Sequence, residues 1–293
     1  MPRSICLHKT SQIGFRESNE DKEGYLINLG PDGLAEDPNF AAIDFFIVCD
    51  GHGGDAVSNF VCPKLQKILT DRKLTYPLDH NFIIDVFQRV QKEIEQHPKN
   101  IGNGCGSTVL IVVRYMDNNK REWIQVINLG DCRAVMARGG LAMQLSIDHK
   151  PSCMDEKLRI DAVNRLHGTK EKIHYDAGDF RIVDLSVSRS MGDNDCRPFI
   201  SSVPEIFQYL LVSHDEFIIV ACDGCWDTLS SLDAVNFIRD HVGNNFIEKY
   251  NVPGKYPVGP PSQQKNLARK LAQYAISRGS TDNVSILVVF FNQ

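Results

Sequence analysis

Short apolar segments and longer amphipathic segments follow one another along this chain. The short ones are rich in β-branched and aromatic residues, which is typical of buried strands. They cover residues 45–49, 107–114, 123–128, 217–222 and 284–291. The longer ones place apolar residues three and four positions apart, which predicts helices. These cover residues 56–69, 81–95, 155–166, 231–241 and 263–277. Because strands and helices come in runs, the pattern favours a layered α+β fold over a parallel doubly wound sheet.

Two stretches interrupt this pattern with residues that favour turns. Residues 28–39 and 243–261 collect Gly, Pro and Asn, and we predict that both are surface loops. No internal repeat or low-complexity tract is present, so a solenoid is not supported.

Composition and charge narrow the function classes. With 42% hydrophobic and 9% aromatic residues, the 293-residue chain can bury a large core. The net charge of −5 is spread over interspersed acids and bases without a basic block, so we expect no nucleic-acid partner. No apolar run could span a bilayer, and residues 1–10 lack the apolar core of a secretory signal. We therefore expect no membrane association and a cytoplasmic, or also nuclear, location.

The cysteines fit the same picture. There are nine, an odd count, and several stand in or beside apolar segments, as buried free thiols do in reducing compartments. Cys222 and Cys225 form an isolated C-x-x-C, which is weak support for a zinc or redox site.

Aspartates recur at the ends of the predicted strands. Asp50, Asp131 and Asp223 each stand directly after a strand-like segment, and Asp282 stands just before the last one. An ionised carboxylate at the edge of an apolar core costs several kcal/mol unless a cation or hydrogen bonds compensate it. If the four converge, their all-oxygen chemistry would select Mg²⁺ or Mn²⁺ rather than Zn²⁺. At any single position, the alternative is an Asp that only caps a turn.

An amino-terminal stretch adds a cation to these acids. Arg16 stands a few residues before Glu20 and Asp21. Arginine suits a phosphoryl group because its planar donors match two phosphate oxygens. The alternative for this stretch is a solvated polar loop.

Ordered motifs along nearly the whole chain resemble the metal-dependent serine/threonine protein phosphatases of type 2C, the PPM family. The matching segments are Arg16 with Asn19-Glu20-Asp21, Asp50-Gly51-His52-Gly53-Gly54, Gly106-Ser107-Thr108, Asn128-Leu129-Gly130-Asp131-Cys132-Arg133, Asp148-His149-Lys150-Pro151, Leu185-Ser186-Val187-Ser188-Arg189-Ser190-Met191-Gly192-Asp193, Val203-Pro204-Glu205, Asp223-Gly224-Cys225-Trp226-Asp227 and Asp282-Asn283-Val284-Ser285.

The resemblance implies a fold and a metal site. The fold would be a four-layer α-β-β-α sandwich, in which two antiparallel sheets are flanked by helix pairs, and residues 1–293 would form one domain. Asp50 would bridge two Mn²⁺ or Mg²⁺ ions, with Asp223, Asp282 and the Gly51 carbonyl as further direct ligands. The remaining metal-site positions would be Glu20 and Asp21, which hold metal-bound water, and Asp131, at a weaker third site.

It also implies a reaction. A water or hydroxide shared by the two ions would attack the phosphorus of phosphoserine or phosphothreonine without a phosphoenzyme intermediate. Arg16 would hold the phosphate, and His52 would protonate the leaving oxygen. Phosphorylated proteins would be the substrates, and we expect a monomer.

Two rival functions remain open at this point. Cys132 and Cys153 each precede an arginine with C-x₅-R spacing, as in cysteine-dependent phosphatases, but neither has a glycine-rich loop that would bind an anion. A catalytically dead relative that serves as a binding scaffold is the second rival, although every expected ligand is present.

Overall fold

Two five-stranded sheets form the centre of the molecule. The structure is a computed structural model that describes residues 5–29, 43–242 and 266–291. The first sheet, here called the β14 sheet, has these strands in spatial order: β1 (Ile5–Gln12), β15 (Val284–Phe291), β14 (Asp215–Ala221), β8 (Arg133–Arg138) and β9 (Leu141–Gln144). The second, the β3 sheet, has these: β13 (Glu205–Leu210), β7 (Glu122–Leu129), β6 (Val109–Met116), β3 (Ile43–Cys49) and β2 (Lys22–Leu29). Every neighbouring pair in both sheets is antiparallel.

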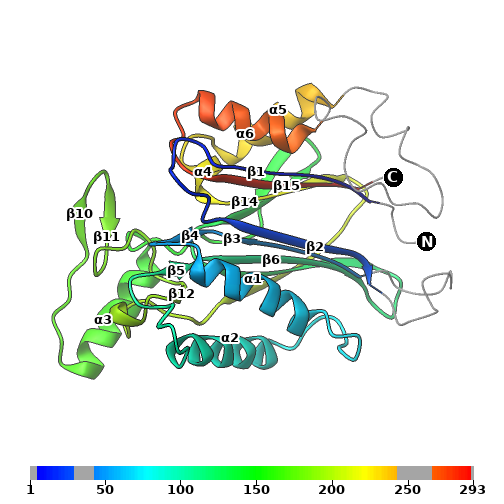
Figure 1. The fold of residues 1–293 in the computed structure, drawn as a ribbon. Helices are drawn as coiled ribbons and strands as arrows, with labels where there is room; N and C mark the ends of the chain where they lie inside the picture. Colours follow the sequence, from blue (N-terminus) through cyan, green and yellow to red (C-terminus); the bar gives the residue numbers. More distant parts are fainter. Residues whose placement is uncertain (1–4, 30–42, 243–265, 292–293) are drawn as a thin grey trace.

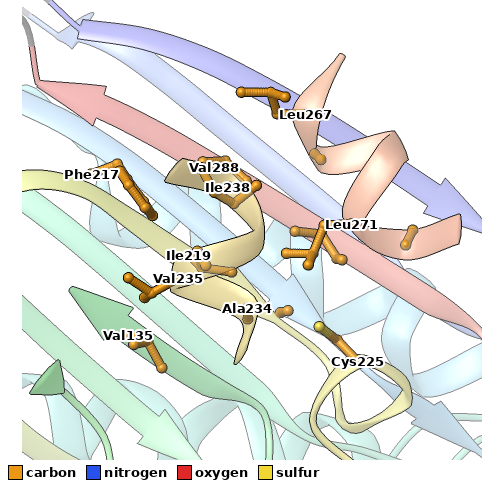
Figure 2. Close-up of a cluster of buried hydrophobic side chains, with 14 of the residues drawn as sticks. Val135, Phe217, Ile219, Cys225, Ala234, Val235, Ile238, Leu267, Leu271 and Val288 are labelled. Atoms are coloured by element: carbon orange, nitrogen blue, oxygen red, sulfur yellow. The ribbon is translucent and has the colours of Figure 1, made fainter. Parts of the chain in front are cut away.

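Helices cover the outer face of each sheet (Figure 1). Helices α1 (Ala56–Leu69) and α2 (His80–Glu95) pack on the β3 sheet. Helices α5 (Ser231–His241) and α6 (Leu267–Ser277) pack on the β14 sheet, where Figure 2 shows Leu271 beside side chains of that sheet. A third apolar cluster lies between the two sheets.

Side-chain alternation along the strands separates these clusters. In β14, Phe217 and Ile219 face α5 and α6, whereas Ile218 and Val220 face the other sheet. Successive side chains of a strand point to opposite faces, and both faces of β14 are covered, so the strand is apolar on both. The same alternation determines whether a residue that follows a strand faces the helices or the opposite sheet.

The remaining elements lie near one end of the sheets. They are β4 (Gly51–His52), β5 (Gly106–Ser107) and β12 (Met191–Gly192), which form a small sheet, the hairpin β10 (His174–Asp176) and β11 (Asp179–Arg181), helix α3 (Met154–His167), the short helix α4 (Asp223–Trp226) and a 3₁₀ turn (Asn194–Cys196). No helix in the described ranges combines the length and apolar character needed to cross a bilayer.

The prediction of a mixed α+β fold is confirmed. The two main sheets are antiparallel, as the family resemblance implies. Predicted helices 56–69 and 231–241 match α1 and α5, and the others differ by a few residues at their ends; α6 begins at Leu267, and residues 263–265 lie outside the described part. The predicted loop at 28–39 begins too early, because β2 continues to Leu29; residues 30–39 and 243–261 lie outside the described residues.

One predicted strand, 107–114, is interrupted. It divides into β5 and β6 at Thr108. The Thr108 N–H donates to the Asp50 carbonyl over 2.8 Å, and the Thr108 hydroxyl accepts from the Asp50 N–H over 3.2 Å. The break therefore fixes the backbone that follows β3.

Candidate metal centre and active site

The ends of several strands meet at a cleft of about 420 Å³. Eight of the nine residues that the sequence singles out line it: Arg16, Glu20, Asp50, Gly51, His52, Asp131, Asp223 and Asp282. These residues come from both ends of the chain and from three positions between them. The structure therefore brings together the strand-end aspartates that the sequence left far apart.

Like charges dominate the floor of this cleft. Burial, followed by the charges of Asp223, Asp21 and Asp131, raises the pKa of Asp50 well above its usual range. Burial and the charge of Asp131 likewise raise the pKa of Asp223, although Lys150 opposes this rise. Carboxylates in this state favour a proton or a metal cation between them.

Asp21 is the predicted residue that does not line the cleft. It is only 3% exposed, and neither of its carboxylate oxygens receives a hydrogen bond from the described part of the chain. One of its oxygens lies with a carboxylate oxygen of Asp50 and the Cys222 sulfur in a group whose ligand atoms are all within 4.8 Å of one another. Burial raises the pKa of Asp21 to about 6. A buried carboxylate without a donor fits a nearby divalent cation, so these residues are suited to a metal site.

Asp131 has a different environment from the other acids. It is 1% exposed, and the Lys150 ammonium lies 2.5 Å from its Oδ2. Burial lowers the pKa of Lys150, but the charge of Asp131 outweighs this and raises it above its usual value. Asp131 is thus already compensated by a lysine.

Gly51 lies where a side chain has no room. A Cβ at this position would stand 2.5 Å from the Glu20 carbonyl oxygen and 3.0 Å from the Ser58 hydroxyl. That hydroxyl donates to the Glu20 carbonyl over 2.5 Å. The glycine therefore lets the segment after β3 pack directly against the segment that carries Glu20.

Asn283 joins the amino-terminal segment to the start of β15. Its Nδ2 donates to the carbonyls of Ile13, at 2.8 Å, and Ser18, at 2.9 Å, and its Oδ1 accepts from the Glu20 N–H at 2.8 Å. The neighbouring Asp282 accepts a 2.7 Å hydrogen bond from Arg16 Nη2. These contacts hold Arg16 and Glu20 at the cleft.

The Glu20 side chain is positioned from two sides. The Gly54 N–H donates to Oε2 over 3.2 Å, and the Ser18 hydroxyl donates to Oε1 over 3.3 Å. Its carboxylate thus lies at the loop between β4 and α1.

His52 is held by a buried carboxylate. Its Nε2 lies 2.8 Å from Asp193 Oδ2 and 3.0 Å from Oδ1, and Asp193 is 3% exposed. Burial lowers the pKa of His52, but the hydrogen bond and charge of Asp193, with Asp131 and Glu20, outweigh it and raise the pKa. The Ser190 hydroxyl also donates to Asp193.

Three residues with clear roles were not among the predicted site residues. Asn283 and Lys150 belong to the matched motifs, but their partners lie far away in the chain, so sequence spacing gives no signal for them. Asp193 belongs to a matched motif, and only the structure shows that its partner is His52, 141 residues away in the chain.

A family model described as protein phosphatase 2C matches residues 8–284. The chain belongs to this family. It is 58% identical to a PP2C-like domain-containing protein of Acanthamoeba polyphaga mimivirus over 178 residues, which cover 61% of this chain and 99% of that protein. It is 34% identical to probable protein phosphatase 2C 11 of Arabidopsis thaliana over 260 residues, which cover 87% of this chain and 60% of that protein.

Solved structures of other proteins share the fold of this PP2C-family chain. A phosphatase from a pathogenic strain of Toxoplasma gondii superposes with a TM-score of 0.74 at 20% identity, covering 100% of this chain and 94% of that one. A C. elegans sex determining protein gives a TM-score of 0.75 at 22% identity, covering 100% and 65%. At these identities the likeness shows the fold alone.

Proposed function

We propose that this chain is a metal-dependent protein phosphatase that hydrolyses phosphoserine and phosphothreonine in proteins. The observation that carries the proposal is the convergence of Asp50, Asp223 and Asp282 in one cleft, where no lysine or arginine among the described residues lies within 4.0 Å of Asp50 or Asp223. Membership of the protein phosphatase 2C family supports it.

The ligand set follows the cleft. Asp50, Asp223, Asp282 and the Gly51 carbonyl would hold two Mn²⁺ or Mg²⁺ ions directly, because oxygen donors suit these hard cations. Glu20 and Asp21 would act through metal-bound water. The contact of Lys150 with Asp131 means that a third ion at Asp131 would compete with an ammonium group already in place.

Two cationic side chains would act on the substrate. When bound, the ions would supply an activated water near neutral pH. Arg16 is 57% exposed at the cleft, so its guanidinium can reach a phosphoryl group while Asp282 orients it. His52 lies in the cleft with Asp193 behind it, a geometry suited to proton donation to the departing serine or threonine oxygen.

A cysteine-dependent mechanism has little support from the structure. Cys132 is fully buried, and burial together with the charge of Asp50 raises its pKa well above the usual range, which disfavours the thiolate. Cys153 precedes α3, outside the residues that line the cleft. The alternative of a catalytically dead binding scaffold predicts no turnover at any metal concentration.

The deciding experiment measures hydrolysis of matched phosphoserine, phosphothreonine and phosphotyrosine peptides while Mn²⁺ or Mg²⁺ is titrated. We expect activity on the first two that chelation abolishes and added metal restores. Asp223→Asn should remove turnover, whereas Cys132→Ser should leave it nearly unchanged. Activity that survives chelation but is lost in Cys132→Ser would overturn the proposal, and so would an inactive wild-type chain that binds metal normally.

A further inference from the structure

A second hollow of the molecule lies at helices α1 and α2, away from the cleft. Its volume is about 800 Å³, and it shares no lining residue with the cleft. Five apolar side chains line it: Phe60, Pro63, Ile68, Leu74 and Phe82. All except Pro63 also pack against the buried cluster beneath the two helices. We call this hollow the α1–α2 groove; its size and apolar floor are those of a binding site for several large side chains.

The sequence of α1 explains why apolar surface remains outside the core. Val61 is fully buried among side chains of the β3 sheet, whereas Phe60 and Ile68 are only half-buried and line the groove. After the helix ends, the Leu74 N–H donates to the Asp71 carbonyl over 2.9 Å, and this turn holds Leu74 at the groove. Regular backbone structure therefore fixes the apolar floor before any ligand binds, which lowers the entropic cost of binding.

Charged side chains, most of them basic, also line the groove: Lys64, Lys67, Lys73, Arg89 and Asp71. Lys64 contacts Glu93, and Arg89 Nε lies 2.9 Å from Asp85 Oδ2. The other two lysines have no acidic side chain within 4.0 Å in the part of the chain that the structure describes. Two uncompensated positive charges thus lie beside an apolar floor.

We propose that the α1–α2 groove docks an amphipathic segment of a partner protein whose apolar side chains are flanked by Asp or Glu. Its apolar side chains would cover Phe60 and Leu74, and its acids would pair with Lys67 and Lys73. A helix with apolar residues three and four positions apart suits a groove of this kind. A second copy of the chain is a poorer occupant, because a two-fold contact here would bring the same lysines towards each other.

Helix α1 connects this groove to the cleft. It begins at Ala56, shortly after His52, and runs along the β3 sheet away from β4 (Figure 1). At the helical rise, Lys67 lies about 16 Å along the axis from that start. An extended peptide needs at least about five residues to cover this distance. A docked segment would therefore recruit substrates phosphorylated at least that far away; this recruiting role rests on the proposed function, whereas docking itself does not.

The first test measures fluorescence anisotropy of a labelled synthetic peptide of about 12 residues, with Leu and Phe on one helical face and Glu on the other. We expect saturable binding to the full chain that weakens as NaCl is raised, because the basic side chains are exposed to screening. A peptide with Lys in place of Glu, and one with Ser in place of Leu and Phe, should each bind at least about tenfold more weakly.

Charge reversal in the protein locates the binding. The double variant Lys67→Glu, Lys73→Glu should bind the acidic peptide about tenfold more weakly and should now prefer the peptide that carries Lys. The matched control is Lys92→Glu, Lys99→Glu, because both lysines are exposed, neither lines the groove, and the net charge changes equally. Leu74→Ser should weaken binding about fivefold without changing its salt dependence.

Three results would overturn the site: equal weakening in the two double variants, equal binding of acidic and basic peptides, or no saturable binding. Self-association in sedimentation equilibrium that Leu74→Ser abolishes would also overturn it, because a second copy would then occupy the groove.

A kinetic test addresses recruitment. A phosphopeptide joined to the acidic segment by about eight extended residues should have a lower KM than the phosphopeptide alone, with kcat unchanged. The Lys67→Glu, Lys73→Glu variant should lose this gain, and an equal KM for both substrates in the wild type would overturn the recruiting role. Hydrolysis of the phosphopeptide alone tests the phosphatase, and anisotropy needs no turnover, so failure of the groove is distinguishable from failure of the proposed function.

Discussion

The two ends of strand β3 each carry an acid, and the two acids have opposite surroundings. At the start, Asp44 is 1% exposed and accepts a 2.6 Å hydrogen bond from Nε of the equally buried Arg114. After the end, Asp50 has like charges as neighbours, and they raise its pKa together with burial. One strand therefore holds a compensated carboxylate and an uncompensated one.

Strand β14 repeats the contrast. At its start, Asp215 is fully buried and receives hydrogen bonds from Arg138 at 2.6 and 3.0 Å. Asp223, just after its end, lies near Asp131 and Asp227, and its pKa is raised. Since breaking a buried ion pair is costly, the arginine ends serve stability. The carboxylates that repel one another lie at the opposite ends of β3 and β14, where a metal ion can neutralise them. The two strands thus carry structural acids at their starts and functional acids after their ends.

The largest effect should come from neutralising an uncompensated acid. We expect Asp50→Asn to lower phosphopeptide turnover by at least about 10⁴-fold, more than about 5 kcal/mol in transition-state stabilisation, because a shared metal ligand is lost. Metal-free stability, measured by urea unfolding, should stay equal or rise because a repulsive charge is removed. A variant that loses both activity and fold would show that Asp50 is a structural acid instead.

Neutralising a compensated acid should do the reverse. Asp44→Asn should reduce the free energy of unfolding by about 3 kcal/mol, because the buried Arg114 loses this partner but keeps Glu122 at 2.8 Å. Turnover per folded molecule should be unchanged. Asp85→Asn is the control: its pair with Arg89 is exposed, so its loss should cost below about 1 kcal/mol in the same urea titration. Equal losses in the two variants would remove the basis of the comparison.

A pH titration of stability should reveal the contribution of another compensated carboxylate, Glu156. Burial raises its pKa, but the hydrogen bond from Arg189 and the charge of Arg159 outweigh it and lower the pKa from 4.5 to about 2. Because the folded pKa is depressed, the stabilisation is complete above pH 4.5 and is lost as the pH falls towards 2. The predicted contribution is about 3 kcal/mol, visible as a slope in urea unfolding between these pH values. Glu156→Gln should lack that part of the slope; an unchanged slope would contradict the assignment.

A divalent metal should stabilise the folded chain only through the uncompensated carboxylates of the cleft, such as Asp50 and Asp223. At a hundredfold excess of Mn²⁺ over its dissociation constant, the free energy of unfolding should rise by about 2.7 kcal/mol. KCl at matched ionic strength controls for screening of surface charge. The double variant Asp50→Asn, Asp223→Asn should show no such rise, and a rise that persists would place the metal elsewhere.

The sequence predicted what local pattern determines. A run of β-branched and aromatic residues located β3, and helical spacing located α1 and α5. The sequence also showed Asp50, Asp131 and Asp223 directly after strand-like segments but left their convergence open, and the structure brings all three to one cleft. Unlike this convergence, the elements depend on residues that are neighbours in the chain.

Other features depend on partners far apart in the chain. Strand β1 was missed, because buried polar residues such as His8 and Thr10 interrupt its apolar pattern. The pairing of Asp131 with Lys150, and of His52 with Asp193, arises only when separate segments pack together. The fold determines which acidic side chain pairs with a basic one, and the composition of a motif does not encode this pairing.

The bridge made by Asn283 has a consequence for how the protein is produced. Its side chain joins segments 263 to 270 residues apart, and the strand it precedes pairs with β1. During synthesis, Arg16 and Glu20 emerge early, but their anchor Asn283 is translated at least 263 residues later. The cleft can therefore be completed only when β15 has left the ribosome, so a shorter nascent chain would not dephosphorylate its surroundings.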